Sequence, residues 1–347
     1  MIHANHLART GQPGERVTNT AKPILILVGP TASGKTALSV ELASRITGGG
    51  ECISADSMQV YRGMDIGTAT PMLEERAGIP HHLLDVADPH EAGFTVHDWL
   101  TRAEAAIEEV QARGRLPILV GGTNLYLRAL LEGVFEGEPI PPGIRADLEA
   151  QTTEHLRARL VEEDPPSAER IHPNDRRRTI RALEILEATG TPISSRQTQW
   201  AEQVMKPRRP ATIACLDWDP SELNRRINQR VGLMMEQGFL EEVRALLKMG
   251  RLGRQAAEAV GYKELESHLE GHCTLQAAIE QIKIRSRRYG KQQRTWIRRF
   301  HAIPGVVRIS CTGEDALGVG LERLLNHFPG GPEDPSDGPP DNHRGRG

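Results

Sequence analysis

The sequence predicts an α/β protein with a parallel sheet core flanked by helices and an inserted helical subdomain. Two observations carry this prediction. Apolar, β-branched runs alternate with stretches of helical periodicity in the first part of the chain, which is typical of βαβ crossovers and hence of a parallel sheet. From residue 144 to 203 the chain reads as helical and highly charged, without a clear strand pattern. With 347 residues, the chain is long enough for one large domain or two ordinary ones.

The stretch at 24–36, ILILVGPTASGKT, is the centre of the predicted core. Its apolar start is long enough for a buried strand. The loop after it fits the phosphate-binding pattern G-x-x-x-x-G-K-[ST] at Gly29, Gly34, Lys35 and Thr36. The glycines let successive amides turn toward an anion, Lys35 adds a positive charge, and the Thr36 hydroxyl can hold magnesium or a phosphate oxygen. We therefore predict a P-loop NTPase-like core that binds a diphosphate or a nucleotide, in preference to a glycine-rich turn without a ligand.

Three further strands are predicted before residue 137, at 51–55, 80–86 and 116–120. Asp56 follows the first of them, so it would share the carboxyl edge of the sheet with the phosphate loop. The alternative role for an aspartate in this place is a helix N-cap. The strand at 116–120 runs into Gly-Gly-Thr and the helical segment NLYLRALLEGV. This backbone is therefore expected to come close either to a ligand or to the next helix.

The second part of the core is predicted to begin with an apolar strand at 211–218. The next helix has a clear start signal, in which Asp219 caps the first turn and Pro220 occupies it. Glu222 completes the pattern of a capping box.

Composition divides the chain into a core and three other parts. The core is predicted at 22–137 and 207–325, and the helical subdomain at 138–206. Residues 1–21 are predicted as a polar, flexible extension, and residues 326–347 carry too much Pro, Gly and Asp to pack. The N-terminus lacks the apolar core of a signal peptide. Four scattered cysteines and the absence of an apolar window of 18 residues favour a cytoplasmic protein without a membrane span.

A basic helix is predicted near the end of the core. Eight Lys or Arg residues and no acidic residue lie between Lys283 and Phe300, although the whole chain has a net charge of −3. Five of them follow one helical face: Lys283, Arg287, Lys291, Arg294 and Arg298. The apolar face is formed by Ile282, Tyr289, Trp296 and Phe300. Solvated helices normally mix both signs, so this run favours a polyanion partner over a plain solvated face.

A second basic cluster lies in the predicted subdomain, at Arg176, Arg177, Arg178 and Arg181. Two basic surfaces beside a phosphate-binding core predict a large RNA or DNA that is held from two sides.

Seven motifs in this order make the chain resemble the tRNA dimethylallyltransferases, also called tRNA isopentenyltransferases. They are GPTASGKT at 29–36, ISADSMQVYRGMDIGTATP at 53–71, HHLLDVADP at 81–89, LVGGTNLYLRALLEG at 119–133, RIHPNDRRRTIRALEI at 170–185, AVGYKEL at 259–265 and RSRRYGKQQRTWIRRF at 285–300. The phosphate loop alone is shared by many families, but this set is specific. The resemblance spans residues 22–325 without a large gap.

The resemblance implies transfer of a dimethylallyl group from dimethylallyl diphosphate to N6 of the adenosine 3′-adjacent to the tRNA anticodon, with release of diphosphate. It implies Mg²⁺ as cofactor, with Thr36 as its ligand, and a monomer that binds the tRNA anticodon arm and no membrane. Asp56 would accept the proton of the adenine amine. Lys35 and Thr36 would stabilise the leaving diphosphate, and Thr123 would line the channel where base and diphosphate meet.

The residues implied in binding fall into two sets. The diphosphate would contact Gly29, Thr31, Ala32, Ser33, Gly34, Lys35, Thr36 and Arg230, with Arg226 as the alternative to Arg230. The tRNA would contact Asp56, Ser57, Met58, Gln59, Thr123, Arg177, Arg178, Arg181, Gly261, Tyr262, Lys263, Lys291, Gln292, Gln293, Arg294 and Arg298.

Other functions share parts of this pattern. A P-loop small-molecule kinase would need a lid of arginines over ATP and would gain nothing from the basic helix. A prenyltransferase of free adenine nucleotides has the same core but no reason to carry an RNA-binding helix. A nucleotide switch of the GTPase kind would require an N-K-x-D motif, which the sequence lacks.

Overall fold

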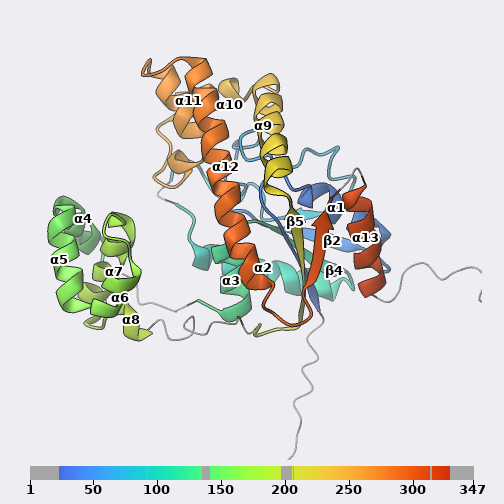
Figure 1. Cartoon of the computed structure of the whole chain (residues 1–347), viewed down its shortest axis with the longest axis horizontal. Coiled ribbons are helices and arrows are strands. Elements are labelled where there is room, and N and C mark those ends of the chain that lie inside the picture. The colour runs from blue at the N-terminus through green and yellow to red at the C-terminus, as the bar shows by residue number, and fades with distance from the viewer. Residues whose placement is uncertain are drawn as a thin grey trace, which may run out of the picture.

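The computed structural model describes residues 23–91, 93–134, 141–196, 205, 207–312 and 315–328. The predicted extension at 1–21 and most of the predicted tail fall outside these residues. A parallel sheet of six strands lies at the centre, in the order β3-β2-β4-β1-β5-β6 (Figure 1). The strands are β1 (Ile24–Val28), β2 (Gly50–Ala55), β3 (His81–His82), β4 (Leu116–Gly121), β5 (Ala211–Trp218) and β6 (Val307–Cys311).

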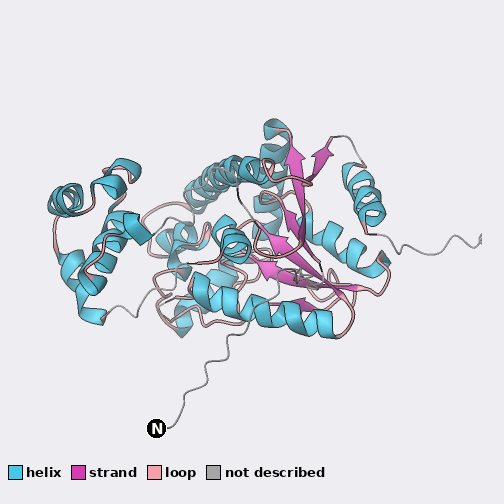
Figure 2. Cartoon of the chain, turned by 90° about the horizontal axis from the view of Figure 1, so that it is seen from below, coloured by secondary structure: helices cyan, strands magenta, loops and turns pink. Residues whose placement is uncertain are grey.

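Helices cover both faces of the sheet (Figure 2). Leu25 and Leu27 of β1 pack with α1 (Lys35–Arg45) and α13 (Ala316–His327) on one face. The alternate residues of β1 pack into the larger core on the other face. The helices there are α2 (Val96–Ala112), α3 (Asn124–Glu132), α9 (Pro220–Glu236), α10 (Phe239–Met249), α11 (Tyr262–Leu269) and α12 (Leu275–Phe300), with a short 3₁₀ helix at Ala256–Glu258. Because both faces of β1 are buried, its sequence is apolar at every position.

The subdomain forms a separate helical group. Its helices are α4 (Pro142–Ala150), α5 (Thr153–Glu163), α6 (Pro165–Arg170), α7 (Arg176–Thr189) and α8 (Ile193–Arg196). They stand apart from the sheet-bearing body in both views (Figures 1 and 2). Leu148, Leu156, Leu160 and Leu183 are fully buried in a core of their own. Among the described residues, no helix is long and apolar enough to cross a membrane.

Two sequence predictions about this fold need correction. The strand predicted at 80–86 is only two residues long, because Leu83 and Asp85 adopt positive φ angles of 63° and 57° and turn the chain away. The predicted capping box at the start of α9 is only half formed. Asp219 accepts the backbone N–H of Glu222, but the Glu222 side chain pairs with Arg225 instead of returning to the cap.

Candidate active site

The phosphate loop joins β1 to α1 and ends in a left-handed turn. Gly34 is the N-cap of α1 and has a φ of 86°. Among the described residues no side chain caps this helix, so its first N–H groups can bind an anion. The Lys35 ammonium group donates to the carbonyl oxygens of Gly29 and Pro30, at 2.9 and 2.8 Å. Thr36, the second residue of α1, is half-buried beside them.

Two side chains from outside the loop hold its backbone in place. Trp218 Nε1, at the end of β5, donates to the Ser33 carbonyl at 3.1 Å, and Arg226 Nε donates to the Ala32 carbonyl at 2.9 Å. The Arg226 guanidinium also stacks on the Trp218 ring, 4.3 Å from its centre. Arg226 therefore supports the loop from behind. The only sequence signal for Trp218 was its place at the end of a strand.

Lys35, Arg230 and Asp56 form a charged cluster at the carboxyl edge of the sheet. Arg230 lies beside the loop, with its guanidinium 3.4 Å from the Thr31 hydroxyl. Burial and the charge of Arg230 lower the pKa of Lys35 to about 7, whereas the charge of Asp56 acts in the opposite direction. Burial also lowers the pKa of Arg230. Two cations held this close favour an added anion, because it relieves their repulsion.

Asp56 and Thr123 stand at the ends of two paired strands, β2 and β4. Asp56 Oδ1 accepts the backbone N–H of Met58 at 2.9 Å. The chain continues from Asp56 through turns, so its alternative role as a helix cap is wrong. Thr123 Oγ1 accepts the backbone N–H of Ser57 at 3.0 Å. This bond ties the segment that carries Asp56 to the Gly-Gly-Thr loop.

The glycines after β4 allow two close approaches. A Cβ on Gly121 would lie 2.2 Å from the carbonyl oxygen of Ala55, and a Cβ on Gly122 would lie 2.2 Å from Nε2 of Gln293. Gln293 belongs to α12. The Gly-Gly-Thr loop therefore comes close to a helix that is remote in the sequence, whereas the sequence predicted a ligand or the next helix in the chain.

Gln293 and Tyr289 bring α12 into the site. Gln293 is 3% exposed and uses both ends of its amide inside the protein, so the structure contradicts its predicted role as a tRNA contact. The Tyr289 hydroxyl interacts with Thr123 and Gln293, and burial raises the pKa of this phenol, as does the charge of Asp56. The sequence pattern placed Tyr289 only on an apolar face. Tyr289 and Gln293 lie about one helical turn apart. This spacing in the sequence could have placed both side chains on the same face of α12.

The predicted tRNA contact Tyr262 is also wrong, because this side chain is fully buried. Its hydroxyl donates to Glu242 at 2.6 Å, and the same carboxylate accepts the backbone N–H groups of residues 65–67 at 2.7 to 3.2 Å. Tyr262 therefore fixes the segment that follows Asp56. Gly261 is buried with a φ of 100°, whereas Lys263 is exposed.

Gln59 and Met58, next to Asp56, face inward as well. The Gln59 amide accepts from the Ser54 hydroxyl at 2.9 Å and donates to the Ala69 carbonyl at 3.1 Å, and Met58 packs against the larger core. These contacts hold the turn that presents Asp56.

The basic stripe of α12 divides into engaged and exposed members. Lys283 pairs with a glutamate three residues earlier, and Arg287 donates to an asparagine of α9. The Arg294 Nε is buried and has no hydrogen-bond partner in the described part of the chain. Lys291 and Arg298 are exposed, and neither forms an ion pair within the described residues. These two charges are the most open to a polyanion.

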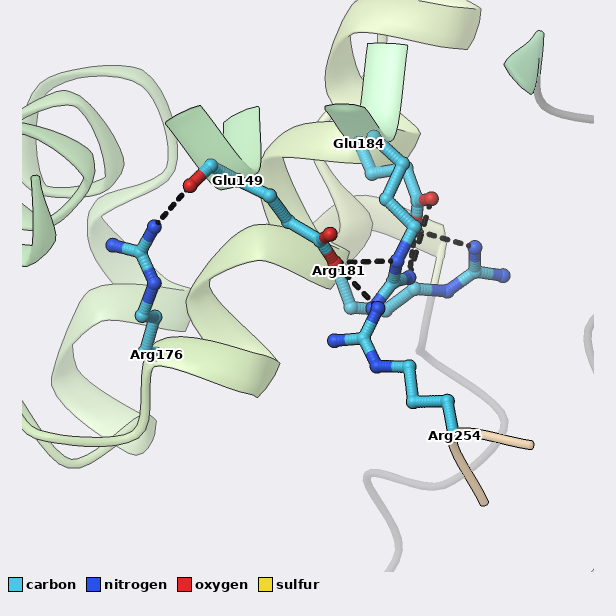
Figure 3. A network of polar contacts seen from close by, with 6 residues as sticks. Glu149, Arg176, Arg181, Glu184 and Arg254 are labelled. Atoms are coloured by element: carbon cyan, nitrogen blue, oxygen red, sulfur yellow. Dashed lines mark hydrogen bonds and ion pairs between the residues drawn. The ribbon is translucent and has the colours of Figure 1, made fainter. Parts of the chain in front are cut away.

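The second basic cluster is partly neutralised (Figure 3). Arg176 donates to the backbone carbonyl of Glu149 at 2.8 Å, and Arg181 pairs with the buried carboxylate of Glu184 at 2.9 Å. The Glu149 carboxylate in turn accepts from Arg254, which belongs to the body, at 2.5 Å. Arg178 pairs with Asp175 at 3.2 Å, so three of the four arginines of the cluster, Arg176, Arg178 and Arg181, already have partners. The more exposed members of the cluster are Arg177 and Arg178.

The fold and the site define a P-loop NTPase-like protein whose phosphate loop lies beside a carboxylate and a basic helix. A family model described as IPP transferase matches residues 59–300. A curated relative from Symbiobacterium thermophilum, named tRNA dimethylallyltransferase, is 47% identical over 308 residues, which cover 87% of this chain and 94% of the relative. The chain belongs to the tRNA dimethylallyltransferase family, and it is a prenyltransferase.

Solved structures agree with this assignment. The full-length tRNA isopentenylpyrophosphate transferase from Bacillus halodurans is 39% identical with a TM-score of 0.64, over 88% of this chain and 95% of that one. A eukaryotic dimethylallyltransferase described as acting on tRNA is 32% identical with a TM-score of 0.71, over 84% of this chain and 74% of that one. The kinase interpretation is therefore not favoured.

Proposed function

We propose that this enzyme transfers the dimethylallyl group of dimethylallyl diphosphate to N6 of the adenosine directly 3′ of the tRNA anticodon and releases diphosphate. The observation that supports this reaction is the charged cluster at one sheet edge. Lys35 and Arg230 are cations beside a phosphate loop, and the charge of Asp56 acts on both of them. A site for a diphosphate leaving group therefore lies next to a carboxylate that can receive a proton.

The cations and the carboxylate of the cluster have different roles in the reaction. The bond between C1 of the dimethylallyl group and the diphosphate oxygen breaks, and a new bond forms between C1 and N6 of the adenine. Lys35 and Arg230 stabilise the negative charge that collects on the diphosphate. Asp56 takes the proton that N6 loses. Arg226, which supports the loop backbone, is the weaker candidate for direct contact with the diphosphate.

Mg²⁺ fits this arrangement as an ion held mainly by the substrate. Magnesium commonly keeps several waters and binds through substrate phosphates and one or two protein oxygens. Among the described residues, no group of three or more His, Cys, Asp or Glu side chains could hold a metal. The Thr36 hydroxyl would be the protein ligand, and the bound ion would neutralise part of the diphosphate charge.

The adenosine is stacked in the anticodon loop, so it has to be turned out to reach Asp56. Lys291 and Arg298 on α12, and Arg177 and Arg178 on the subdomain, are the proposed phosphate contacts that hold the anticodon arm. We propose a cytoplasmic protein, because its four cysteines are free and widely spaced, and a monomer, because Lys35, Arg230 and Asp56 form the cluster without needing a residue from a second copy. Light scattering after gel filtration measures the mass in solution.

The identity of the donor substrate distinguishes the proposed prenyl transfer from its alternatives. We expect label from dimethylallyl diphosphate to enter bulk tRNA, with release of diphosphate, and ATP to be neither consumed nor required. Phosphorylation of a nucleotide by ATP without prenyl transfer would support the kinase instead. Transfer to free adenosine monophosphate at a rate equal to that for tRNA would support the adenine-nucleotide prenyltransferase.

Asp56→Asn tests the proposed proton acceptor. An asparagine oxygen can still accept the N–H of Met58, but the amide cannot take a proton. We expect the single-turnover rate to fall by about 10²- to 10⁴-fold. The affinity for tRNA should stay within about twofold of the parent, because the turn keeps its hydrogen bond. A parent-like rate would leave Asp56 with a structural role alone.

A further inference from the structure

Gln293 links three parts of the site that are far apart in the sequence. Its Oε1 accepts the backbone N–H of Thr31, in the phosphate loop, at 2.8 Å. Its Nε2 donates to the carbonyl oxygen of Gly122, in the Gly-Gly-Thr loop, at 3.1 Å. The side chain itself belongs to α12, which carries the exposed charges Lys291 and Arg298. One planar amide thus spans the loop on the diphosphate side and the loop that carries Thr123.

We propose that Gln293 is a positioning residue that sets the distance and orientation of the phosphate loop relative to the Gly-Gly-Thr loop. This inference rests on the proposed function, in which the donor lies on the first loop and the acceptor base beside the second.

The surroundings of Gln293 are built to hold it there. The amide occupies the space in which a side chain of residue 122 would begin, since a Cβ on Gly122 would lie 2.2 Å from Nε2. Gly290, one turn earlier on α12, is also buried, and a Cβ there would lie only 3.2 Å from Cδ1 of Ile227 on α9. Gly122 therefore leaves room for the amide, and Gly290 lets α12 pack closely on α9 in the position from which the amide reaches both loops.

Both bonds would be costly to lose. Gln293 is 3% exposed, so water does not readily replace its amide at the Thr31 N–H or the Gly122 carbonyl. Tyr289 adds to this arrangement, because its hydroxyl interacts with both Gln293 and Thr123. The hydrogen bonds of Gln293 therefore join the phosphate loop to the Gly-Gly-Thr loop, with Tyr289 beside them.

Group transfer depends on the distance between donor carbon and acceptor nitrogen, and an error of about 1 Å in such a distance can lower a rate by about 10²-fold. A residue that fixes the two loops relative to each other should therefore act on donor binding and on the rate together. A residue that only fills space should act on neither.

Gln293→Met separates these roles, because methionine has nearly the same volume but cannot form either hydrogen bond. Gln281→Met is the matched control, since the same substitution then falls on an exposed glutamine of the same helix that has no proposed role in binding. We expect Gln293→Met to raise the donor KM and to lower kcat, with kcat/KM about 10- to 100-fold below the parent. The affinity for tRNA should stay within about twofold, and the control should keep parent-like donor kinetics.

Three outcomes would overturn this inference. Parent-like donor KM and kcat in Gln293→Met would show that the side chain only fills space. A kcat that falls only in proportion to the fraction of active sites, as counted by tRNA titration, with an unchanged KM would indicate loss of folded enzyme rather than misplacement of the loop. A large loss of tRNA affinity with donor kinetics intact would make Gln293 an RNA contact. Gln293→Asn, whose shorter amide cannot reach both loops, should show the same KM increase and serves if the methionine variant is unstable in a thermal melt.

Binding of inorganic diphosphate separates this inference from the proposed function. Calorimetry of the parent and Gln293→Met measures the loop without any reaction, and we expect weaker binding in the variant. If the parent did not use dimethylallyl diphosphate, the proposed function would fail while this comparison stayed valid. Equal diphosphate affinity in the two proteins would instead overturn the role of Gln293.

Discussion

The protonation state of Lys35 should depend on whether an anion occupies the phosphate loop. Its ammonium group is covered by the loop and lies near Arg230, and these two effects lower its pKa to about 7. Without a ligand it donates to the carbonyls of Gly29 and Pro30. An anion on the loop would favour the protonated form and raise the pKa again. Donor binding and protonation of Lys35 should therefore be linked.

We expect donor binding at pH 8 to take up most of one proton. Lys35 is mostly neutral above its pKa of about 7 in the free enzyme and becomes charged when the diphosphate binds. The donor affinity should consequently fall as the pH rises above 7, by up to about tenfold per pH unit. Calorimetry in two buffers with different ionisation enthalpies measures this uptake. Lys35→Met should abolish it, and uptake that persisted in this variant would assign the proton to another group.

Sequence patterns predicted which residues gather at the sheet edge better than they predicted which residues lie on the surface. Lys35, Asp56 and Thr123 meet at one edge because parallel strands end there, which alternation of strands and helices predicts. Gln293 and Tyr262 lie next to predicted RNA contacts but are buried. Their burial follows from contacts with residues that are remote in the chain, which neither periodicity nor charge encodes.

The helix α12 has one face buried in the protein and one face exposed to solvent. Its inner face carries Gln293, Ile297 and Phe300, which are buried against the sheet-bearing body. Its outer face carries Lys291 and Arg298, which are exposed. The predicted stripe of five charges is thus reduced to two that are open to solvent and unpaired within the described residues. Within the stripe, RNA affinity should rest mainly on these two.

The double variant Lys291→Ala/Arg298→Ala tests that division. Removal of one phosphate contact should flatten the dependence of log K on log[salt] by about 0.7 to 0.9, so the pair should flatten it by about 1.5 to 2. The affinity for dimethylallyl diphosphate should hardly change. Arg225→Ala/Arg244→Ala is the matched control, because it removes two exposed arginines that pair with glutamates on α9 and α10. An unchanged slope in the α12 variant would leave this helix without an RNA role.

The strands show what periodicity can and cannot predict. β1, β2, β4 and β5 lie close to their predicted positions, and β1 is apolar at every position because both of its faces are buried. β2 is buried as well but contains Glu51, whose carboxylate is paired with His82 and Arg113. β6 was missed. It is an edge strand whose residues alternate between buried and exposed, and at five residues, VRISC, it offers too short a pattern to recognise. Edge position is a property of the sheet and not of the segment.

At the scale of the whole molecule, the subdomain and the body each carry one basic surface. The subdomain has its own apolar core, and the ion pair between Arg254 and Glu149 joins it to the body. Both partners are more than a third exposed, so this pair should contribute at most about 1 kcal/mol to stability. The relative position of the two surfaces should therefore be fixed largely by what binds between them.

The last prediction is that Arg177 and Arg178 hold the same tRNA molecule as α12. Arg177→Ala/Arg178→Ala should flatten the salt dependence of tRNA binding by about 1.5 to 2. Combined with Lys291→Ala/Arg298→Ala, the two effects should add to about 3 to 4. They should add because separate contacts on one polyanion release separate counterions. Filter binding across a range of salt concentrations measures the slopes. Two pairs that bound different tRNA molecules would each weaken only their own complex, and the stoichiometry would then exceed one tRNA per chain. A slope that the subdomain variant leaves unchanged would restrict tRNA binding to the body.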